Sequence, residues 1–175
     1  MANVLMVVAQ NGFRDEEFLV PKEILEKAGH NVKIASITRA KATGMKGLTI
    51  QPHMAAYEAN PGFFDCIVIV GGPGAAALAE NKDVRELVSR ASEMERIVAA
   101  ICLGPLTLAK AGVLRERNAT VFPDMPAIQA LRNAGAAYWK KPVVQDGHIL
   151  TADGPHSAGE FGEALVEMLK ERKQA

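Results

Sequence analysis

Three short runs of apolar residues constrain the fold of this chain most strongly. Residues 3–9 (NVLMVVA), 66–70 (CIVIV) and 97–101 (IVAAI) contain almost no polar side chains, so each is expected to be a strand covered on both faces. Residues 21–29 lie between the first two runs, and their proline and glycine are typical of the beginning and end of a helix. Strands that alternate with helices predict an α/β fold, with a mostly parallel sheet and helices on both faces.

The second half of the chain continues this alternation. Residues 126–134 have the spacing of a short helix, and residues 143–144 and 148–151 flank an Asp-Gly pair that is typical of a hairpin turn. The last helix is predicted to begin near Ser157, which stands three residues before Glu160 as in a capping box.

The composition is that of a globular protein whose surface carries no excess charge. Hydrophobic residues make up 49% and charged residues 23%, and 20 basic residues balance 20 acidic ones, which argues against a nucleic-acid partner. No linker or repeat interrupts the chain, so we expect one domain over residues 1–175. The apolar runs are too short to span a bilayer and no basic segment precedes residues 4–9, so we expect no membrane partner and a cytoplasmic location.

Two cysteines, Cys66 and Cys102, cannot form a disulfide framework and are expected to be free thiols. Cys66 begins an apolar strand, which indicates a packed core residue. No spacing of Cys, His and Asp suggests a metal site, and glycines 71–74 do not have the spacing of a dinucleotide motif. We therefore expect neither a metal nor a cofactor.

Cys102 stands at a predicted corner between a strand and a helix. The sequence Ala100-Ile101-Cys102-Leu103-Gly104 has the small-x-nucleophile-x-small pattern of a nucleophile elbow, with cysteine in place of serine. A helix that begins after Gly104 would lower the pKa of the thiol. We therefore expect the rate at which iodoacetamide labels Cys102 to titrate near or below about pH 6. A buried structural cysteine is the alternative, and the motif alone does not decide between them.

Two other loops are predicted to lie beside this corner. Residues 10–17 and 71–74 also follow strands, and the carboxyl ends of parallel strands meet at one edge of the sheet, where ligands bind. Taken alone, the glycines of residues 71–74 indicate only a tight turn. Their position matters because glycine lets backbone N–H groups approach a ligand closely.

Together these motifs resemble the ThiJ/PfpI superfamily, in particular the branch with the Parkinson's-disease-associated protein deglycase and the PfpI-type intracellular proteases. The resemblance rests on residues 99–105 (AAICLGP), on Val70-Gly71-Gly72 and on Glu17, four residues before a proline. It implies a flavodoxin-like three-layer sandwich with a reactive Cys102 on the elbow. It also implies a protonated Glu17 hydrogen-bonded to that cysteine, an oxyanion hole made by the amides of Gly72 and Leu103, and a homo-oligomer.

Glu17 can fill this role only if its carboxyl group keeps a proton. An ionised glutamate beside a thiolate would repel it, so the carboxyl must be desolvated and donate its proton to the sulfur. The alternative is a solvated acidic turn formed by Asp15, Glu16 and Glu17, in which Glu16 is the neighbour most easily confused with Glu17.

The sequence also departs from the family at two positions. The PfpI-type proteases carry a histidine directly after the nucleophile, where this chain has Leu103, which argues against a protease. The deglycase branch has a histidine near the cysteine where this chain has Phe122. His156, which follows Pro155 in a loop that borders the family's pocket, is the histidine that could replace it. A surface histidine is the alternative, and Glu17 could itself move the proton.

Two classes of function remain open. In the first, the Cys102 thiolate attacks a small reactive carbonyl compound or the adduct that it forms with amines, including adducts on proteins, as in a deglycase or glyoxalase. In the second, Cys102 is a peroxide-sensitive thiol of a stress-protective protein that does not turn over substrate. The sequence has no His-x-Glu pair late in the chain, which argues against amidotransfer.

Overall fold

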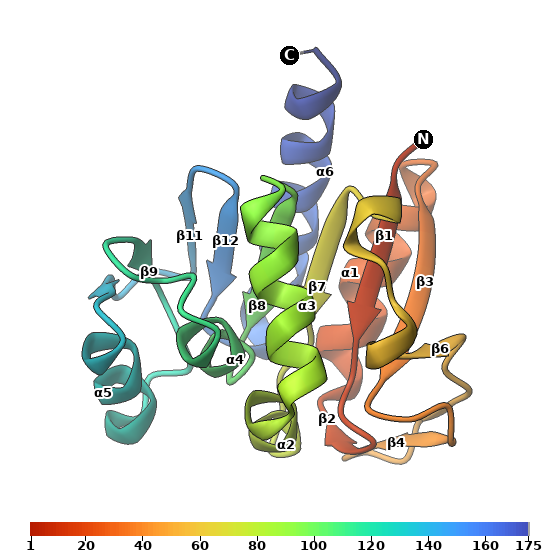
Figure 1. The fold of residues 1–175 in the computed structure, drawn as a ribbon, viewed down its shortest axis with the longest axis horizontal. Helices are drawn as coiled ribbons and strands as arrows, with labels where there is room; N and C mark the ends of the chain where they lie inside the picture. The colour runs from red at the N-terminus through yellow and green to blue at the C-terminus, as the bar shows by residue number, and fades with distance from the viewer. Residues whose placement is uncertain (175) are drawn as a thin grey trace.

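A seven-stranded sheet forms the centre of the computed structural model, which describes residues 1–174 (Figure 1). Its strand order is β11-β12-β8-β7-β1-β3-β6. All neighbouring strands run parallel except the hairpin β11-β12. The bounds are β1 Asn3–Val7, β3 Asn31–Ser36, β6 Met54–Ala55, β7 Cys66–Ile69, β8 Ile97–Ile101, β11 Val143–Asp146 and β12 Ile149–Ala152.

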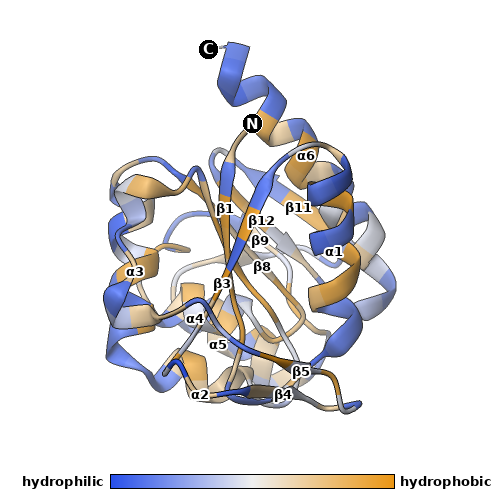
Figure 2. Ribbon diagram, turned by 90° about the vertical axis from the view of Figure 1, so that its right-hand side faces the viewer, coloured by the Kyte–Doolittle hydropathy of each residue, from blue (hydrophilic) through white to orange (hydrophobic). Residues whose placement is uncertain are grey.

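Helices cover both faces of this sheet, as the sequence predicts. Figure 2 shows the sheet edge-on, with α1 and α6 on one side and α2, α3 and α4 on the other. The fold is therefore the three-layer α/β sandwich of the flavodoxin type. The helices are α1 Asp15–Lys27, α2 Ala75–Glu80, α3 Lys82–Glu93, α4 Pro105–Lys110, α5 Met125–Asn133 and α6 Ala158–Gln174, with short 3-10 turns η1 Ala56–Glu58, η2 Pro61–Phe63 and η3 Pro155–Ser157.

Alternate residues of the strands fill two separate hydrophobic cores. In β1, Leu5 and Val7 pack towards α3 and α4, whereas Val4 and Met6 pack towards α1 and α6. All four side chains are fully buried. Because successive residues of a strand point to opposite faces, a strand with a core on each side must be apolar at nearly every position.

Short strands outside the main sheet complete the fold. β2 (Asn11–Phe13) pairs with β4 (Ala42–Gly44), which pairs with β5 (Thr49–Ile50). β9 (Asn118–Ala119) pairs with β10 (Ala137–Tyr138). Strands β2, β4 and β5 matter for function because they shape the loops beside the carboxyl end of β1.

One helix start and one helix cap differ from the sequence prediction. Helix α1 begins at Asp15, six residues before Pro21, because Asp15, Glu16 and Glu17 occupy its first turn, where negative charge is favourable. Pro21 lies inside the helix and removes one backbone donor. The predicted capping box before α6 is wrong: the Ser157 hydroxyl donates to Asp153 Oδ1 at 2.5 Å instead.

Backbone hydrogen bonds hold the loops after β1 and β7 together. Arg14 N–H donates to the carbonyl of Gly71, and Gly74 N–H donates to that of Gly12, both at 2.9 Å. The Cys102 N–H donates to the carbonyl of Ala152, at the end of β12. The expected meeting of loops at this edge of the sheet is therefore present.

Helices α1 and α6 pack closely at Gly162. A Cβ atom there would lie 2.8 Å from Ile24 Cδ1 and 3.2 Å from Pro21 Cα. We predict that Gly162→Ala lowers the free energy of unfolding by about 1–3 kcal/mol through overpacking, although alanine is the better helix former. Gly159→Ala in the same helix meets no atom within 4 Å and should leave stability unchanged or slightly raised. Denaturant unfolding of both variants tests this, and equal effects would contradict it.

Candidate active site

Cys102 occupies a strained corner between β8 and α4. Its φ angle is 63°, in the left-handed region that residues other than glycine seldom adopt. The carbonyl of Cys102 accepts a hydrogen bond from Phe122 N–H at 2.9 Å. Gly104 lets the two elements cross, because a Cβ atom there would lie 2.5 Å from the carbonyl oxygen of Ile69. This is the strand-turn-helix geometry of the predicted nucleophile elbow.

Glu17 reaches the same corner from the first turn of α1. Its side chain is fully buried, and neither carboxyl oxygen has a hydrogen-bond partner that meets normal geometry among residues 1–174. The polar group that faces it is the Cys102 thiol. A Cβ atom on Gly71 would lie 2.6 Å from Glu17 Oε1 and 2.7 Å from Cys102 Cβ, so only a glycine fits between the two side chains and β7.

Glu16 lies in a different environment. It pairs with Arg14, whose Nε lies 3.2 Å from Glu16 Oε1, and with Lys46, whose Nζ lies 2.9 Å from Glu16 Oε2. Its own backbone N–H and these cations lower the pKa of Glu16 to about 2. The acidic segment is thus not a uniformly solvated turn, since Glu16 is held by cations and Glu17 faces the thiol.

The pKa values of Glu17 and Cys102 are coupled. Burial raises the pKa of Glu17 to about 7. With Glu17 ionised, burial and the charge of that carboxylate raise the pKa of the Cys102 thiol to about 12. The expectation that the helix alone lowers the pKa of this thiol is therefore wrong. Near neutral pH the pair holds one proton and one negative charge between two groups.

Two backbone amides point at the sulfur of Cys102. The N–H groups of Gly72 and Leu103 face it and act to lower the pKa of the thiol, although less strongly than burial raises it. Gly72 has a φ of 110°, and a Cβ atom there would lie 2.4 Å from Arg14 N. The amides that the family resemblance assigns to the oxyanion hole are thus beside the sulfur.

A pocket of about 210 Å³ opens above Cys102. Its lining is mostly apolar, and Arg14 is its one charged side chain within the described chain. The loop that carries Met45 forms one wall and is held by the buried Asp15 carboxylate, which accepts from the N–H groups of Lys46 and Leu48 at 3.1 Å. The lining residues are Arg14, Met45, Gly72, Pro73, Cys102, Leu103 and Phe122.

Pro155 and His156 lie outside this lining. The His156 side chain is 72% exposed, and its Nε2 lies 3.5 Å from Asp153 Oδ1. A Cβ atom on Gly154 would contact both the His156 ring and the Phe122 ring, so the histidine lies close to Phe122, which lines the pocket. Five of the seven predicted site residues therefore meet at Cys102, Pro155 and His156 do not, and the catalytic and binding roles of all seven stay predictions.

Arg14 and Pro73 lie in the predicted loops 10–17 and 71–74 but were not named as site residues, and Met45 lies outside both loops. Arg14 directly precedes the acidic residues of α1, and that adjacency is the signal that could have indicated it. Met45 had no such signal, because its loop reaches the pocket through contacts distant in sequence with Phe13 and Asp15.

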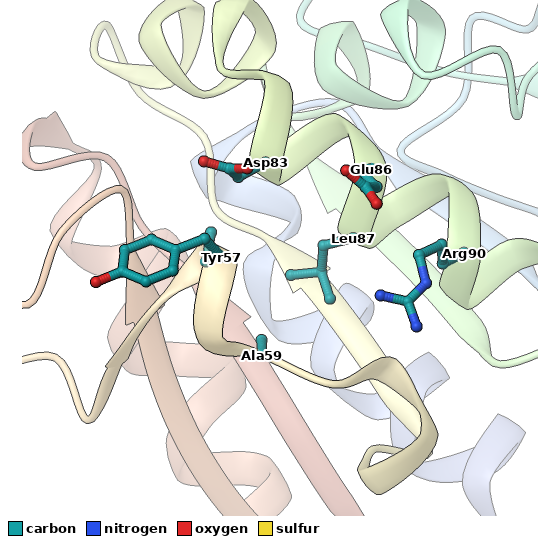
Figure 3. Close-up of a pocket in the computed structure, with 7 residues that line it drawn as sticks. Tyr57, Ala59, Asp83, Glu86, Leu87 and Arg90 are labelled. Atoms are coloured by element: carbon teal, nitrogen blue, oxygen red, sulfur yellow. The ribbon is translucent and has the colours of Figure 1, made fainter.

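A second hollow, between α3 and η1, lacks the chemistry of the first (Figure 3). It measures about 70 Å³ and is lined by Tyr57, Asp83, Glu86 and Arg90 among others, with no thiol or imidazole. Residues 1–174 contain no group of three or more His, Cys, Asp or Glu side chains that could hold a metal ion. No helix in that range is both long and apolar enough to cross a membrane.

Comparison with known proteins settles the family. The model of the DJ-1/PfpI family matches residues 2–168. The chain belongs to the DJ-1/PfpI family. An uncharacterized protein of Methanocaldococcus jannaschii is 39% identical over 174 residues, covering 99% of this chain and 85% of the relative. A deglycase of Pyrococcus abyssi is 31% identical, covering 95% of this chain and 99% of the relative.

Other members of the DJ-1/PfpI family agree in sequence and fold. A glutathione-independent glyoxalase of Caenorhabditis elegans is 29% identical, covering 96% of this chain and 89% of the relative. The crystal structure of a ThiJ/PfpI domain protein from Brachyspira murdochii superposes with a TM-score of 0.92 at 31% identity, over 97% of this chain and 96% of that one.

The buried Glu17 predicts a specific dependence of stability on pH. Its pKa is about 7 in the folded protein against an ordinary 4.5, so the folded state binds more protons between these values and stability falls as pH rises. We expect the free energy of unfolding to fall by roughly 3 kcal/mol from pH 4.5 to pH 8 on account of this group. Glu17→Gln should remove this part of the slope in denaturant titrations. An unchanged slope in that variant would contradict the assignment.

Proposed function

We propose that the protein is a cysteine-dependent enzyme that acts on reactive carbonyl compounds or their adducts with amines, with Cys102 as the nucleophile. The observation that carries the proposal is the fully buried Glu17 carboxyl, which faces the Cys102 thiol at the base of a pocket and has no other hydrogen-bond partner in the described chain. The deglycase and glyoxalase names of its relatives support the same class of substrate.

The single negative charge of the pair belongs on sulfur in this proposal. A thiolate at Cys102 accepts hydrogen bonds from the amides of Gly72 and Leu103, whereas a carboxylate at Glu17 has no comparable donor in the described chain. Hydrogen bonds to the charged form stabilise it. Glu17 then keeps the proton and donates it towards the sulfur, and the thiolate is the attacking species.

For an α-oxoaldehyde the proposed reaction begins with addition of the thiolate to the aldehyde carbon. The carbonyl oxygen takes the Glu17 proton, which gives a hemithioacetal. The Glu17 carboxylate then removes the hydrogen on that carbon as a proton, and reprotonation at the neighbouring ketone carbon gives a thioester. Water hydrolyses the thioester to a 2-hydroxy acid and restores the thiol. With an amine adduct, the thiolate displaces the amine from the same carbon, and the departing nitrogen takes the Glu17 proton.

Proteolysis is not proposed. The PfpI-type proteases use a histidine directly after the nucleophile, and this chain has Leu103 at that position. Phe122 occupies the position of the deglycase histidine and lines the pocket. The homo-oligomer and the cytoplasmic location stay predictions.

Oxidation of Cys102 is the second candidate function, because the same contact supports it. A sulfinate on Cys102 would accept a hydrogen bond from the protonated Glu17. A redox sensor needs this stabilisation of the sulfinate but no turnover of substrate. Variants of Glu17 can therefore distinguish the redox sensor from the carbonyl-directed enzyme.

Labelling with iodoacetamide tests where the charge lies. We expect carbamidomethylation of Cys102 to increase as pH rises through about 7, in line with the first ionisation of the pair. Cys66 is fully buried, burial raises the pKa of its thiol, and it should stay unlabelled until the protein unfolds. Mass spectrometry measures both sites. A Cys102 rate that rises only above about pH 10 would place the charge on Glu17 and overturn the thiolate.

Turnover of methylglyoxal by Glu17 variants tests the mechanism. Glu17→Gln keeps a donor of similar shape without the titratable proton, so it should retain a peroxide-generated sulfinate at Cys102 but lose turnover by at least about 100-fold. Glu17→Leu should lose both properties, and Cys102→Ser should be inactive. Cys66→Ala is the control, with wild-type turnover, and none of these proteins should cleave casein.

Three results would contradict this proposal in different ways. Wild-type turnover in Glu17→Gln would exclude Glu17 as the acid and base and make His156 the next candidate. If Glu16 variants show these phenotypes and Glu17 variants do not, Glu16 and not Glu17 would be the partner of Cys102. Absence of any dicarbonyl turnover, with oxidation retained, would favour the redox sensor.

A further inference from the structure

Arg14 brings a positive charge into a pocket that is otherwise apolar. It lines the same cavity as Cys102, together with Met45, Pro73 and Phe122. A mechanism for neutral dicarbonyls makes no use of a guanidinium at this place. Its presence therefore bears on which carbonyl compounds enter the pocket.

The backbone and one carboxylate hold Arg14 in position. Its N–H donates to the carbonyl of Gly71 at 2.9 Å, directly before the glycine whose amide faces the sulfur. On the side chain, Nε lies 3.2 Å from Glu16 Oε1, and Nη2 donates to Glu16 Oε2 at 3.3 Å. Nη1 makes no hydrogen bond to any described residue, which leaves one face of the guanidinium for a ligand.

Two cations share the single Glu16 carboxylate beside the pocket. Glu16 carries one negative charge and contacts two cations, Arg14 and Lys46. The cluster of Arg14, Glu16 and Lys46 therefore sums to plus one. Lys46 is largely exposed, whereas Arg14 is only 29% exposed, so the guanidinium is the cation that a bound molecule meets.

We propose that Arg14 selects substrates in which a carboxylate accompanies the reactive carbonyl, so that the substrate class is the acidic α-oxoaldehydes and their adducts. A guanidinium with free N–H donors binds a carboxylate through charge-assisted hydrogen bonds. The carbonyl carbon then lies at Cys102, while Met45 and Phe122 contact the alkyl part of the substrate. The substrate class rests on the proposed function, whereas the charge selection at Cys102 does not.

Alkylation by two reagents of equal size tests the charge selection without any turnover. Iodoacetate and iodoacetamide share one leaving group and differ in charge, and a thiolate without a neighbouring cation reacts more slowly with the anion. We expect the ratio of iodoacetate to iodoacetamide rates at Cys102 to fall about tenfold in Arg14→Gln, which corresponds to about 1.4 kcal/mol. Arg14→Lys keeps the charge and should retain a ratio above that of Arg14→Gln.

The control for this experiment is Lys110→Gln. Lys110 forms an ion pair with Glu80, and neither residue lines the Cys102 pocket. Removal of this positive charge should therefore leave the ratio of the two alkylation rates unchanged. Equal ratios in wild type and Arg14→Gln, or a parallel loss of both rates, would overturn the proposal. Thermal unfolding shows whether Arg14→Gln folds. If it does not, the rate ratio of wild type is compared with those of Arg14→Lys and of the unfolded protein. A ratio in wild type no higher than in the unfolded protein would then overturn the proposal, because only a folded pocket can raise it.

Steady-state kinetics then tests the substrate class. The probes are 4,5-dioxopentanoate, an α-oxoaldehyde with a carboxylate, and its neutral counterpart 2-oxopentanal. The ratio of their kcat/KM values should favour the acid in wild type and fall about tenfold in Arg14→Gln. No turnover of either probe, with charge-selective alkylation intact, would refute the enzyme and keep the Arg14 selection. Turnover of both with a ratio that Arg14→Gln does not change would refute the selection and keep the enzyme.

Discussion

The absence of a side chain at Gly71 is the constraint on which the site depends. At this position the carbonyl oxygen of Ile101 in β8, the Glu17 carboxyl and Cys102 approach so closely that even a methyl group would lie 2.4–2.7 Å from atoms of all three. The close approach places a buried carboxyl beside a buried thiol, where two negative charges are strongly disfavoured. The chemistry of the pair, in which one proton serves two groups, follows from this close packing of backbone and side chains.

Four consecutive residues at the start of α1 have four different surroundings. Arg14 lines the pocket, Asp15 holds the loop of Met45, Glu16 pairs with cations, and Glu17 faces the thiol. A helix turns by about 100° per residue, so neighbours in sequence point in different directions. One short segment thereby builds the wall of the pocket and its floor.

Local signals predicted the framework, and contacts distant in sequence account for what they missed. The buried strands, the hairpin and the elbow at Cys102 are visible as apolar runs and turn residues, and the family resemblance added Glu17. The start of α1 was missed because Pro21 has the local signature of a first turn. The thiol pKa was mispredicted because burial by the surrounding layers outweighs the nearby helix end. Met45 comes to the pocket from another strand pair, so no local pattern could indicate it.

The left-handed backbone at Cys102 has a consequence for how this protein can evolve. A non-glycine residue held in that conformation costs of order 1–3 kcal/mol, which the hydrogen bonds of its N–H and carbonyl groups to Ala152 and Phe122 must offset. Glycine would adopt the same angles without that cost, so selection for stability alone would remove the cysteine. If the reactivity of the thiol is what maintains cysteine at this corner, lineages released from that selection should drift towards glycine here before the surrounding sheet changes.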